Sequence, residues 1–218
     1  MQSLHLLETD STNSVALDWN APDGSFVWAN AQTGGRGRLG RAWSSPPERG
    51  VYLSILNPFG PQNRFTPFWG ALAVARAIEE ILPVSVECKW PNDILCGGSK
   101  IGGLLCESRG DKMVLGIGLN LNHRQSELPK RPIFPASSLF LLTGKEWKIA
   151  IFVEKIVEKI REHNFSLQDY SARLHGVGKV VKIGGEIGVL RGVNSEGALR
   201  LQTTRGETAI WAGDLQFL

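Results

Sequence analysis

The stretch Gln32–Trp43, QTGGRGRLGRAW, combines three arginines with four glycines. Glycine lets a backbone approach an anion closely, and guanidinium groups bind carboxylate and phosphate oxygens bidentately. Three interpretations fit such a stretch: a disordered arm for nucleic acid, a dinucleotide-binding turn, or a loop that folds over a phosphorylated small molecule. A solvated hairpin with incidental charge is the non-functional alternative.

The dinucleotide interpretation depends on Gly35, Gly37 and Gly40, which spell GxGxxG. That motif needs a strand before it, a helix after it and an acidic residue about 20 positions further on. A strand is expected before it, but Pro46 and Pro47 stand where the helix should continue, and no carboxylate ends the next strand. The nucleic-acid arm is disfavoured because the run occurs once, between two predicted strands.

Two further polar groups follow predicted strands. In KWPND, residues 89–93, Pro91 fixes a turn and leaves polar side chains at a strand end, where they commonly face a ligand. An Asx turn, in which Asn92 and Asp93 bond only their own backbone, is the alternative. Lys100 opens the next strand, KIGGLL, and is either a ligand contact or a solvated lysine.

The segment GIGLNLN, residues 116–122, alternates apolar residues with glycine and asparagine. Alternation places the small and polar positions on one face of a strand. Because an apolar core would reject two asparagines, that face is either wet or carries Asn120 to a ligand's hydroxyl or phosphate oxygens.

Composition excludes several classes of protein. With 42% hydrophobic residues, 21% charged residues and a net charge of +3 over 218 residues, the chain is typical of a globular protein, and its charge alone does not indicate nucleic acid. Three cysteines without CxxC spacing and four histidines without HExxH spacing argue against a zinc site or a disulfide framework. No signal peptide or membrane-spanning pattern is visible, so we expect a cytoplasmic protein.

The chain predicts strands mixed with helices. We expect a helix from Ser11 or Thr12, a helix capped by Thr66 and Pro67, and an amphipathic helix within 147–164. Strands are expected at 26–31, 51–56, 84–90, 100–108 and 113–121. Short β-prone runs separated by turns in 176–218 predict a small β-barrel of roughly 40 residues that leans on the main domain.

Five motifs in order resemble the biotin protein ligases: DSTN at 10–13, QTGGRGRLGRAW at 32–43, KWPND at 89–93, KIGGLLCE at 100–107 and GIGLNLN at 116–122. The later PASSL and the β-rich C-terminus are also similar, so the resemblance spans nearly the whole chain. It implies an α+β protein: a mixed β-sheet catalytic domain flanked by helices, class II synthetase-like, over 1–175, and a C-terminal SH3-like β-barrel over 176–218.

The resemblance implies a two-step reaction. Biotin and MgATP give biotinyl-5'-AMP, and a lysine of a biotin carboxyl carrier protein, from acetyl-CoA carboxylase or a related carboxylase, then takes the biotinyl group. The first step joins two anions, so it needs fixed positive charge.

The site residues that the resemblance implies overlap. The expected catalytic residues are Lys100 and Arg38. The expected biotin-binding residues are Ser11, Thr12, Asn13, Gln32, Gly35, Arg36, Gly37, Arg38 and Lys100. The expected ATP- and adenylate-binding residues are Arg36, Arg38, Arg41, Trp43, Lys89, Asn92 and Asn120, with Trp43 stacking on adenine. Asp93 is the expected magnesium ligand.

Two alternatives remain for the function. A lipoate protein ligase shares the fold and the acyl-adenylate route, although GRGRLGR and KWPND favour biotin. A non-catalytic Arg-Gly nucleic-acid-binding protein would bind with strong salt dependence and need no ATP. The first motif already stands at Asp10, which leads us to expect no DNA-binding domain and no DNA partner; we also expect no membrane partner, and a homodimer is compatible with the resemblance.

Overall fold

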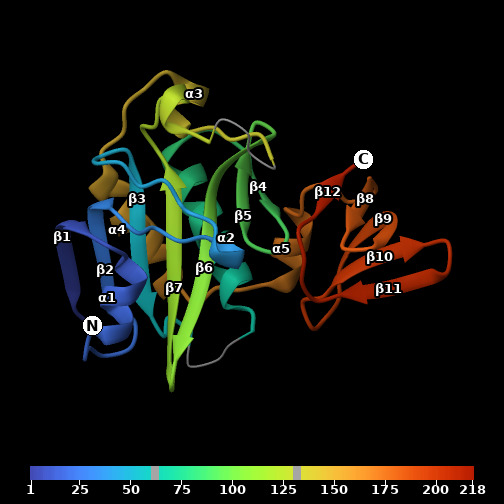
Figure 1. Ribbon diagram of the computed structural model, residues 1–218, viewed down its shortest axis with the longest axis horizontal. Helices are drawn as coiled ribbons and strands as arrows, with labels where there is room; N and C mark the ends of the chain where they lie inside the picture. The colour runs from blue at the N-terminus through green and yellow to red at the C-terminus, as the bar shows by residue number, and fades with distance from the viewer. Residues whose placement is uncertain (60–63, 130–133) are drawn as a thin grey trace.

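The computed structural model describes residues 1–59, 64–129 and 134–218. Its main body is a seven-stranded mixed sheet in the order β1-β2-β3-β7-β6-β5-β4 (Figure 1). β1 runs parallel to β2, and the remaining neighbours are antiparallel. The strands are β1 (Ser3–Thr9), β2 (Phe26–Gln32), β3 (Gly50–Leu56), β4 (Val86–Lys89), β5 (Asp93–Cys96), β6 (Ser99–Arg109) and β7 (Lys112–Asn120).

Helices cover the two faces of this sheet unequally. α2 (Thr66–Ile81) and α4 (Ile149–Arg161) pack on one face and bury a large apolar core that includes Leu53 and Leu115. α1 (Thr12–Asp18) packs on the other face over a small cluster with Val27 and Val114. Much of that second face is crossed instead by the Arg-Gly stretch (Figure 1). The thinly covered face is therefore where a ligand can reach the sheet.

The predicted mixture of a mixed sheet and flanking helices is confirmed, with small shifts at the ends of elements. α1 has Ser11 as its N-cap, as expected. α2 starts one residue earlier than the capping pattern suggested, with Thr66 and Pro67 inside its first turn. The amphipathic helix in 147–164 is α4.

Sequence reasoning did not identify four elements. These are β1, β5, α3 (Leu139–Thr143) and α5 (Leu167–Ala172). Three of them have only four to six residues, too few for a period to be recognised. β1, SLHLLET, has two adjacent leucines that break alternation, and it lies at the edge of the sheet where both faces are partly exposed.

The C-terminal unit consists of β8 (Val180–Ile183), β9 (Glu186–Val193), β10 (Leu199–Thr203), β11 (Gly206–Ile210) and β12 (Gln216–Phe217). Its strand order is β11-β10-β9-β8-β12, and among the described residues no pairing joins β11 to β12, so no closed barrel is seen. The predicted SH3-like barrel is therefore not confirmed, because the two-residue β12 pairs with β8 alone.

The C-terminal unit packs against the main domain, as predicted. Its buried residues, among them Leu190 and Leu215, belong to the same apolar cluster as the core behind the large sheet. Trp90 of the main domain donates its indole N–H to the carbonyl of Gly197 at 3.2 Å. The domain boundary predicted at 175/176 falls between α5 and β8 and stays a prediction. No helix in the described part of the chain has the length and apolar character needed to cross a bilayer.

Candidate active site

A cavity of about 410 Å³ opens on the thinly covered face of the sheet. Its walls come from α1, the Arg-Gly stretch, β4 to β7 and the C-terminal unit. All of the sequence-predicted site residues except Gly35 line it: Ser11, Thr12, Asn13, Gln32, Arg36, Gly37, Arg38, Arg41, Trp43, Lys89, Asn92, Asp93, Lys100 and Asn120. Side chains from positions 11 to 120 are thus gathered around one space.

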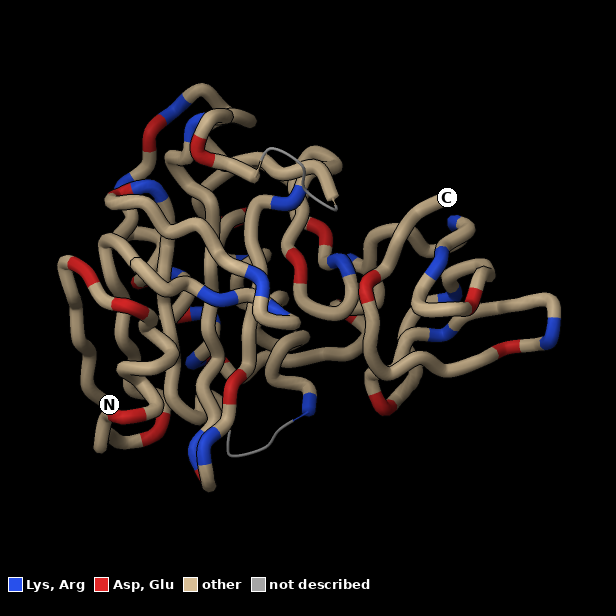
Figure 2. The backbone as a smooth tube through the Cα atoms, in the orientation of Figure 1, with Lys and Arg blue, Asp and Glu red and all other residues tan. Residues whose placement is uncertain are grey.

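The Arg-Gly stretch is a tight hairpin rather than an open coil. The amide of Trp43 donates to the carbonyl of Gly35 at 2.9 Å, and the amide of Gly37 donates to that of Arg41 at 2.7 Å. A Cβ at Gly35 would stand 2.5 Å from the Trp43 carbonyl oxygen, so only glycine fits there. At the tip Leu39 has φ 56° and is 75% exposed. The charges are therefore presented by a folded loop that lies over the sheet (Figure 2).

Two arginines of this hairpin are held by groups outside it. Arg38 donates to Asn92 Oδ1 at 3.3 Å and to the carbonyl of Gly213 at 3.4 Å. Arg41 forms an ion pair with Asp214 of the C-terminal unit, and this hydrogen bond from Arg41 holds the pKa of the Asp214 carboxyl below its usual value. The C-terminal unit thus contributes to the wall of the cavity and fixes two of its cations.

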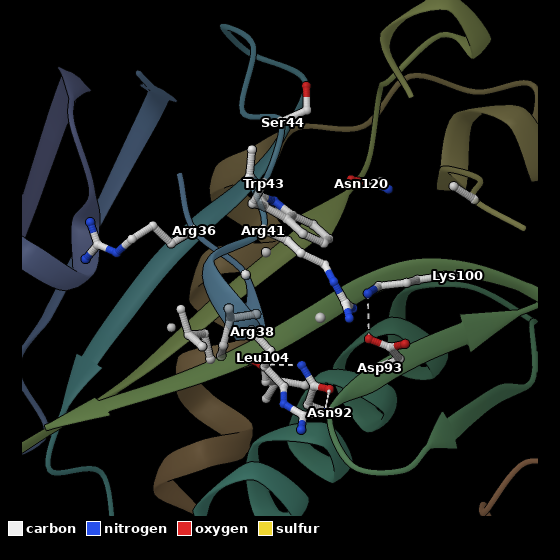
Figure 3. A pocket seen from close by; sticks show the side chains of 18 of the residues that line it. Arg36, Arg38, Arg41, Trp43, Ser44, Asn92, Asp93, Lys100, Leu104 and Asn120 are labelled. Atoms are coloured by element: carbon white, nitrogen blue, oxygen red, sulfur yellow. Dashed lines mark hydrogen bonds and ion pairs between the residues drawn. The ribbon is translucent and has the colours of Figure 1, made fainter. Parts of the chain in front are cut away.

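Lys89 and Lys100 share one carboxylate. Asp93 Oδ1 lies 2.5 Å from Lys100 Nζ (Figure 3). Asp93 Oδ2 lies 3.4 Å from Lys89 Nζ. Lys89 is buried, and this desolvation lowers its pKa although Asp93 acts in the opposite direction. Two cations with one counter-ion leave net positive charge in the cavity, which suits an anionic substrate.

Trp43 lies against the backbone of two strands. A Cβ at Gly118 of β7 would stand 2.5 Å from the indole, and one at Gly103 of β6 would stand 3.5 Å away. Lys100 Nζ is 5.5 Å from the centre of the ring, and Asn120 donates to the Ser137 carbonyl at 3.0 Å beside it (Figure 3). Gly118 and Gly103 have no side chains, so the two strands present a flat surface on which the aromatic ring packs. This accounts for these glycines in the GIGLNLN and KIGGLL patterns.

A polar floor is formed by the start of α1 together with residues of β2 and β3. Thr12 donates to Gln32 Oε1 from its amide at 2.9 Å and from its hydroxyl at 3.1 Å. The Ser54 hydroxyl lies 2.7 Å from Thr12 Oγ1 and 2.5 Å from Asn13 Oδ1. Such buried donors and acceptors at fixed positions suit a ligand ring that itself carries N–H and C=O groups.

Two predicted roles do not match the contacts seen. The Arg36 guanidinium points away from Arg38, Arg41 and Lys100 and instead contacts Glu107 and Ser14 (Figure 3). The Asp93 carboxylate, the expected magnesium ligand, is already paired with two ammonium groups. Within the described residues no group of three or more His, Cys, Asp or Glu side chains could hold a metal ion. The ligand-binding role of Arg36 and the magnesium-binding role of Asp93 stay predictions.

The sequence analysis gave no role to five residues at the site. His123 and Asp214 line the cavity, and Ser45, Ser54 and Glu107 hydrogen-bond to residues that line it. Glu107 could have been found, because strand alternation from Gly103 places it on the same face of β6. Asp214 could not, since it lies 173 positions from Arg41 and in a different unit.

The fold has an open mixed sheet, a cationic hairpin over it and a polar floor beside two lysines. Together these features define a class of enzyme site that joins two anionic substrates. The sequence pattern of the Biotin/lipoate A/B protein ligase family matches residues 7–122. The chain belongs to this family.

Several relatives align over nearly the whole chain. A bifunctional ligase/repressor BirA from Bacillus subtilis is 31% identical over 97% of this chain and 71% of its own length. A biotin--[acetyl-CoA-carboxylase] ligase from Mycobacterium tuberculosis is 30% identical over 97% of this chain and 87% of its own. The structure of the Aquifex aeolicus biotin protein ligase in complex with biotin and ATP superposes with a TM-score of 0.89, 32% identity and coverage of 100% and 98%.

Proposed function

We propose that this protein is an ATP-dependent biotin protein ligase. It activates biotin as biotinyl-5'-AMP and transfers the biotinyl group to a lysine of the biotin carboxyl carrier protein of acetyl-CoA carboxylase or a related carboxylase. The observation that carries the proposal is that polar residues of the floor, Lys100, the hairpin arginines and Trp43 all line one cavity. A carboxylic acid with a polar ring fits between the floor and the lysines.

The first step is attack of a biotin carboxylate oxygen on the α-phosphorus of ATP, with pyrophosphate as the leaving group. Lys100 is placed to contact both the carboxylate and the α-phosphate, which reduces their repulsion and stabilises charge in the transition state. Arg38 and Arg41 line the same cavity, and Lys89 adds a buried charge. Adenine stacks on the Trp43 ring, an arrangement that is favourable between two aromatic rings.

The second step is attack of the acceptor lysine's amine on the acyl carbon, with AMP as the leaving group. Until then the hairpin must keep water from the mixed anhydride. If magnesium accompanies ATP, Asp93 would be the residue of this site to contact it, and the ion would shield the phosphate charge.

The floor favours biotin over lipoate. Thr12, Asn13, Gln32 and Ser54 form a hydrogen-bonded set suited to a ureido group. A dithiolane ring offers no strong donors or acceptors, so it would cover this polar set without adding a hydrogen bond to it.

The experiment is incubation of the purified protein with MgATP, a biotin-carrier domain and either biotin or lipoate, followed by intact-mass measurement of the carrier. We expect a biotinyl addition that requires ATP. A lipoyl addition without a biotinyl one would reject the assignment.

Three finer expectations complete the proposal. The five short antiparallel strands of the C-terminal unit are compatible with an SH3-like class in spite of their open order. ATP-dependent chemistry and three free cysteines favour the cytoplasm. β1 at the edge of the large sheet offers backbone groups for pairing two chains, which sedimentation would detect.

A further inference from the structure

The Glu107 carboxylate connects the hairpin to the floor of the cavity. From the hairpin, Arg36 Nε approaches Glu107 Oε1 at 3.3 Å and an Arg36 terminal nitrogen approaches Glu107 Oε2 at 3.2 Å. From the floor, Asn13 Nδ2 donates to the same Oε2 at 2.7 Å. One side chain of β6 therefore contacts both the hairpin and a predicted biotin-binding residue.

The hydrogen bonds continue beyond Asn13 to the far end of the hairpin. Ser54 Oγ lies 2.5 Å from Asn13 Oδ1 and 2.7 Å from Thr12 Oγ1. Thr12 donates to Gln32 Oε1, and Gln32 Nε2 donates to Ser45 Oγ at 2.9 Å. The network thus begins at one strand of the hairpin, crosses the floor and returns just after the other strand.

Glu107 also decides how the Asn13 amide is turned. A carboxylate only accepts hydrogen bonds, so Asn13 must present its NH2 group to Glu107 and its oxygen to Ser54. Space around the amide is tight, because a Cβ at Gly116 would stand 2.4 Å from Asn13 Oδ1. A neutral amide at position 107 would remove the charge that holds this orientation.

We infer that Glu107 is a positioning residue that couples closure of the hairpin to the orientation of the polar floor. It does so through Arg36 on one side and Asn13 on the other. Ligand atoms that order the floor then favour the closed hairpin, and the closed hairpin favours the floor orientation that binds the ligand. The inference rests on the proposed function for the identity of the ligand, but the coupling between Glu107 and the hairpin is a property of the protein alone.

The first test is limited trypsin cleavage of the ligand-free protein after Arg38 and Arg41, sites that every variant keeps. Glu107→Gln and Arg36→Ala should each speed this cleavage roughly 3- to 30-fold, the effect of losing a partly exposed hydrogen bond to a charged group. The double variant should add little, because both changes remove one interaction. Glu207→Gln is the matched control, since Glu207 binds Arg200 through two contacts of 2.9 Å on the C-terminal unit.

The second test separates the two arms of the network. Labelled biotinyl-adenylate, preformed on the enzyme, is chased with unlabelled adenylate, and biotin affinity is measured by calorimetry. Both variants should release adenylate roughly 3- to 30-fold faster, and both should weaken biotin binding because the coupling is reciprocal. Glu107→Gln should weaken biotin binding by the larger factor, since Arg36→Ala leaves the Asn13 contact in place. A general structural defect would lower the thermal midpoint and would not give this split.

Equal cleavage rates in wild type, Glu107→Gln and Arg36→Ala would overturn the inference, as would fully additive effects in the double variant. Either result would leave the ligase assignment intact. A wild-type protein that forms no biotinyl-adenylate would reject the proposed function, and the cleavage comparison would still decide the coupling.

Discussion

Lys100 and Asp93 form an ion pair inside the candidate site, with Nζ 2.5 Å from Oδ1. Lys100 comes from β6 and Asp93 opens β5, its neighbour in the sheet. The pairing holds the Lys100 ammonium group at the cavity before any substrate arrives. It also implies that an incoming carboxylate and phosphate compete with Asp93 for a cation that is already in place when they bind.

Lys100→Ala should lower the rate of adenylate formation by about 100-fold or more, the effect of removing one charge-stabilising donor from a transition state. Biotin binding should weaken much less, because the polar floor is untouched. Pyrophosphate release with biotin and MgATP measures the first quantity, and calorimetry measures the second. Lys145→Ala, an exposed lysine after α3, is the control. Unchanged pyrophosphate release in Lys100→Ala would remove Lys100 from the mechanism.

Gly118→Ala should displace Trp43 from the strand surface on which it packs. The added methyl group would stand 2.5 Å from the indole, a distance that real contacts do not reach. If Trp43 receives adenine, the KM for ATP should rise about tenfold, the loss expected for an aromatic stacking contact of about 1 kcal/mol together with its misplacement. The KM for biotin should stay within about twofold. Gly185→Ala, which meets nothing within 4 Å, should behave as wild type in the same steady-state assay.

Much of the site was predictable because it is local in sequence. The hairpin from Gly35 to Trp43 carries its own turn and charge pattern, and the alternation around Gly118 and Asn120 predicts one open strand face. These features depend on backbone periodicity and on glycine, which are visible in a short window. The direction in which each arginine points is not local: Arg36 turns to Glu107, 71 positions away.

Two features of the C-terminal unit could not be predicted from the sequence: whether its sheet closes, and its contact with the site. Its short β runs and turns were recognised, but whether the sheet closes depends on where Gln216 and Phe217 pair, and two residues carry no periodic signal. Its part in the site depends on one tertiary contact, Asp214 with Arg41. A pairing between units that are separated by most of the chain follows from packing and not from any pattern in either segment.

Asp214→Asn should loosen the hairpin from the C-terminal unit. The pair is partly exposed, so its contribution is about 1 kcal/mol or less, and we expect adenylate release to become roughly 2- to 5-fold faster. Because the folded-state pKa of Asp214 is lowered, its stabilisation is present above the unfolded pKa near 3.9 and is lost as pH falls through the folded value.

The difference in thermal midpoint between wild type and Asp214→Asn should therefore persist from neutral pH to about pH 5 and shrink below about pH 4. Glu186→Gln, which breaks the Glu186–Arg205 pair of the same unit, is the control for the release rate. Release as slow as in wild type would show that the C-terminal contact does not restrain the hairpin.

Lys89→Met should separate activity from stability. Burial lowers the pKa of Lys89, so in the pH window below its usual value near 10.4 the folded protein binds fewer protons than the unfolded chain, and stability rises with pH across that window. The buried charge therefore costs stability, and Asp93 keeps Lys100 as a partner when Lys89 is replaced. The variant should unfold at the same or a higher temperature while adenylate formation falls about 10- to 100-fold.

The same lowered pKa predicts that wild-type adenylate formation declines at a lower pH than an ordinary lysine would allow, because Lys89 loses its charge as pH rises through the folded value. Lys89→Arg keeps its charge throughout this range, so any activity it retains should lack that alkaline decline. Pyrophosphate release measured from pH 6 to 10 tests both variants. A Lys89→Met protein as active as wild type at pH 8, or an identical alkaline decline in Lys89→Arg, would assign the positive charge of the site to Lys100 and the arginines alone.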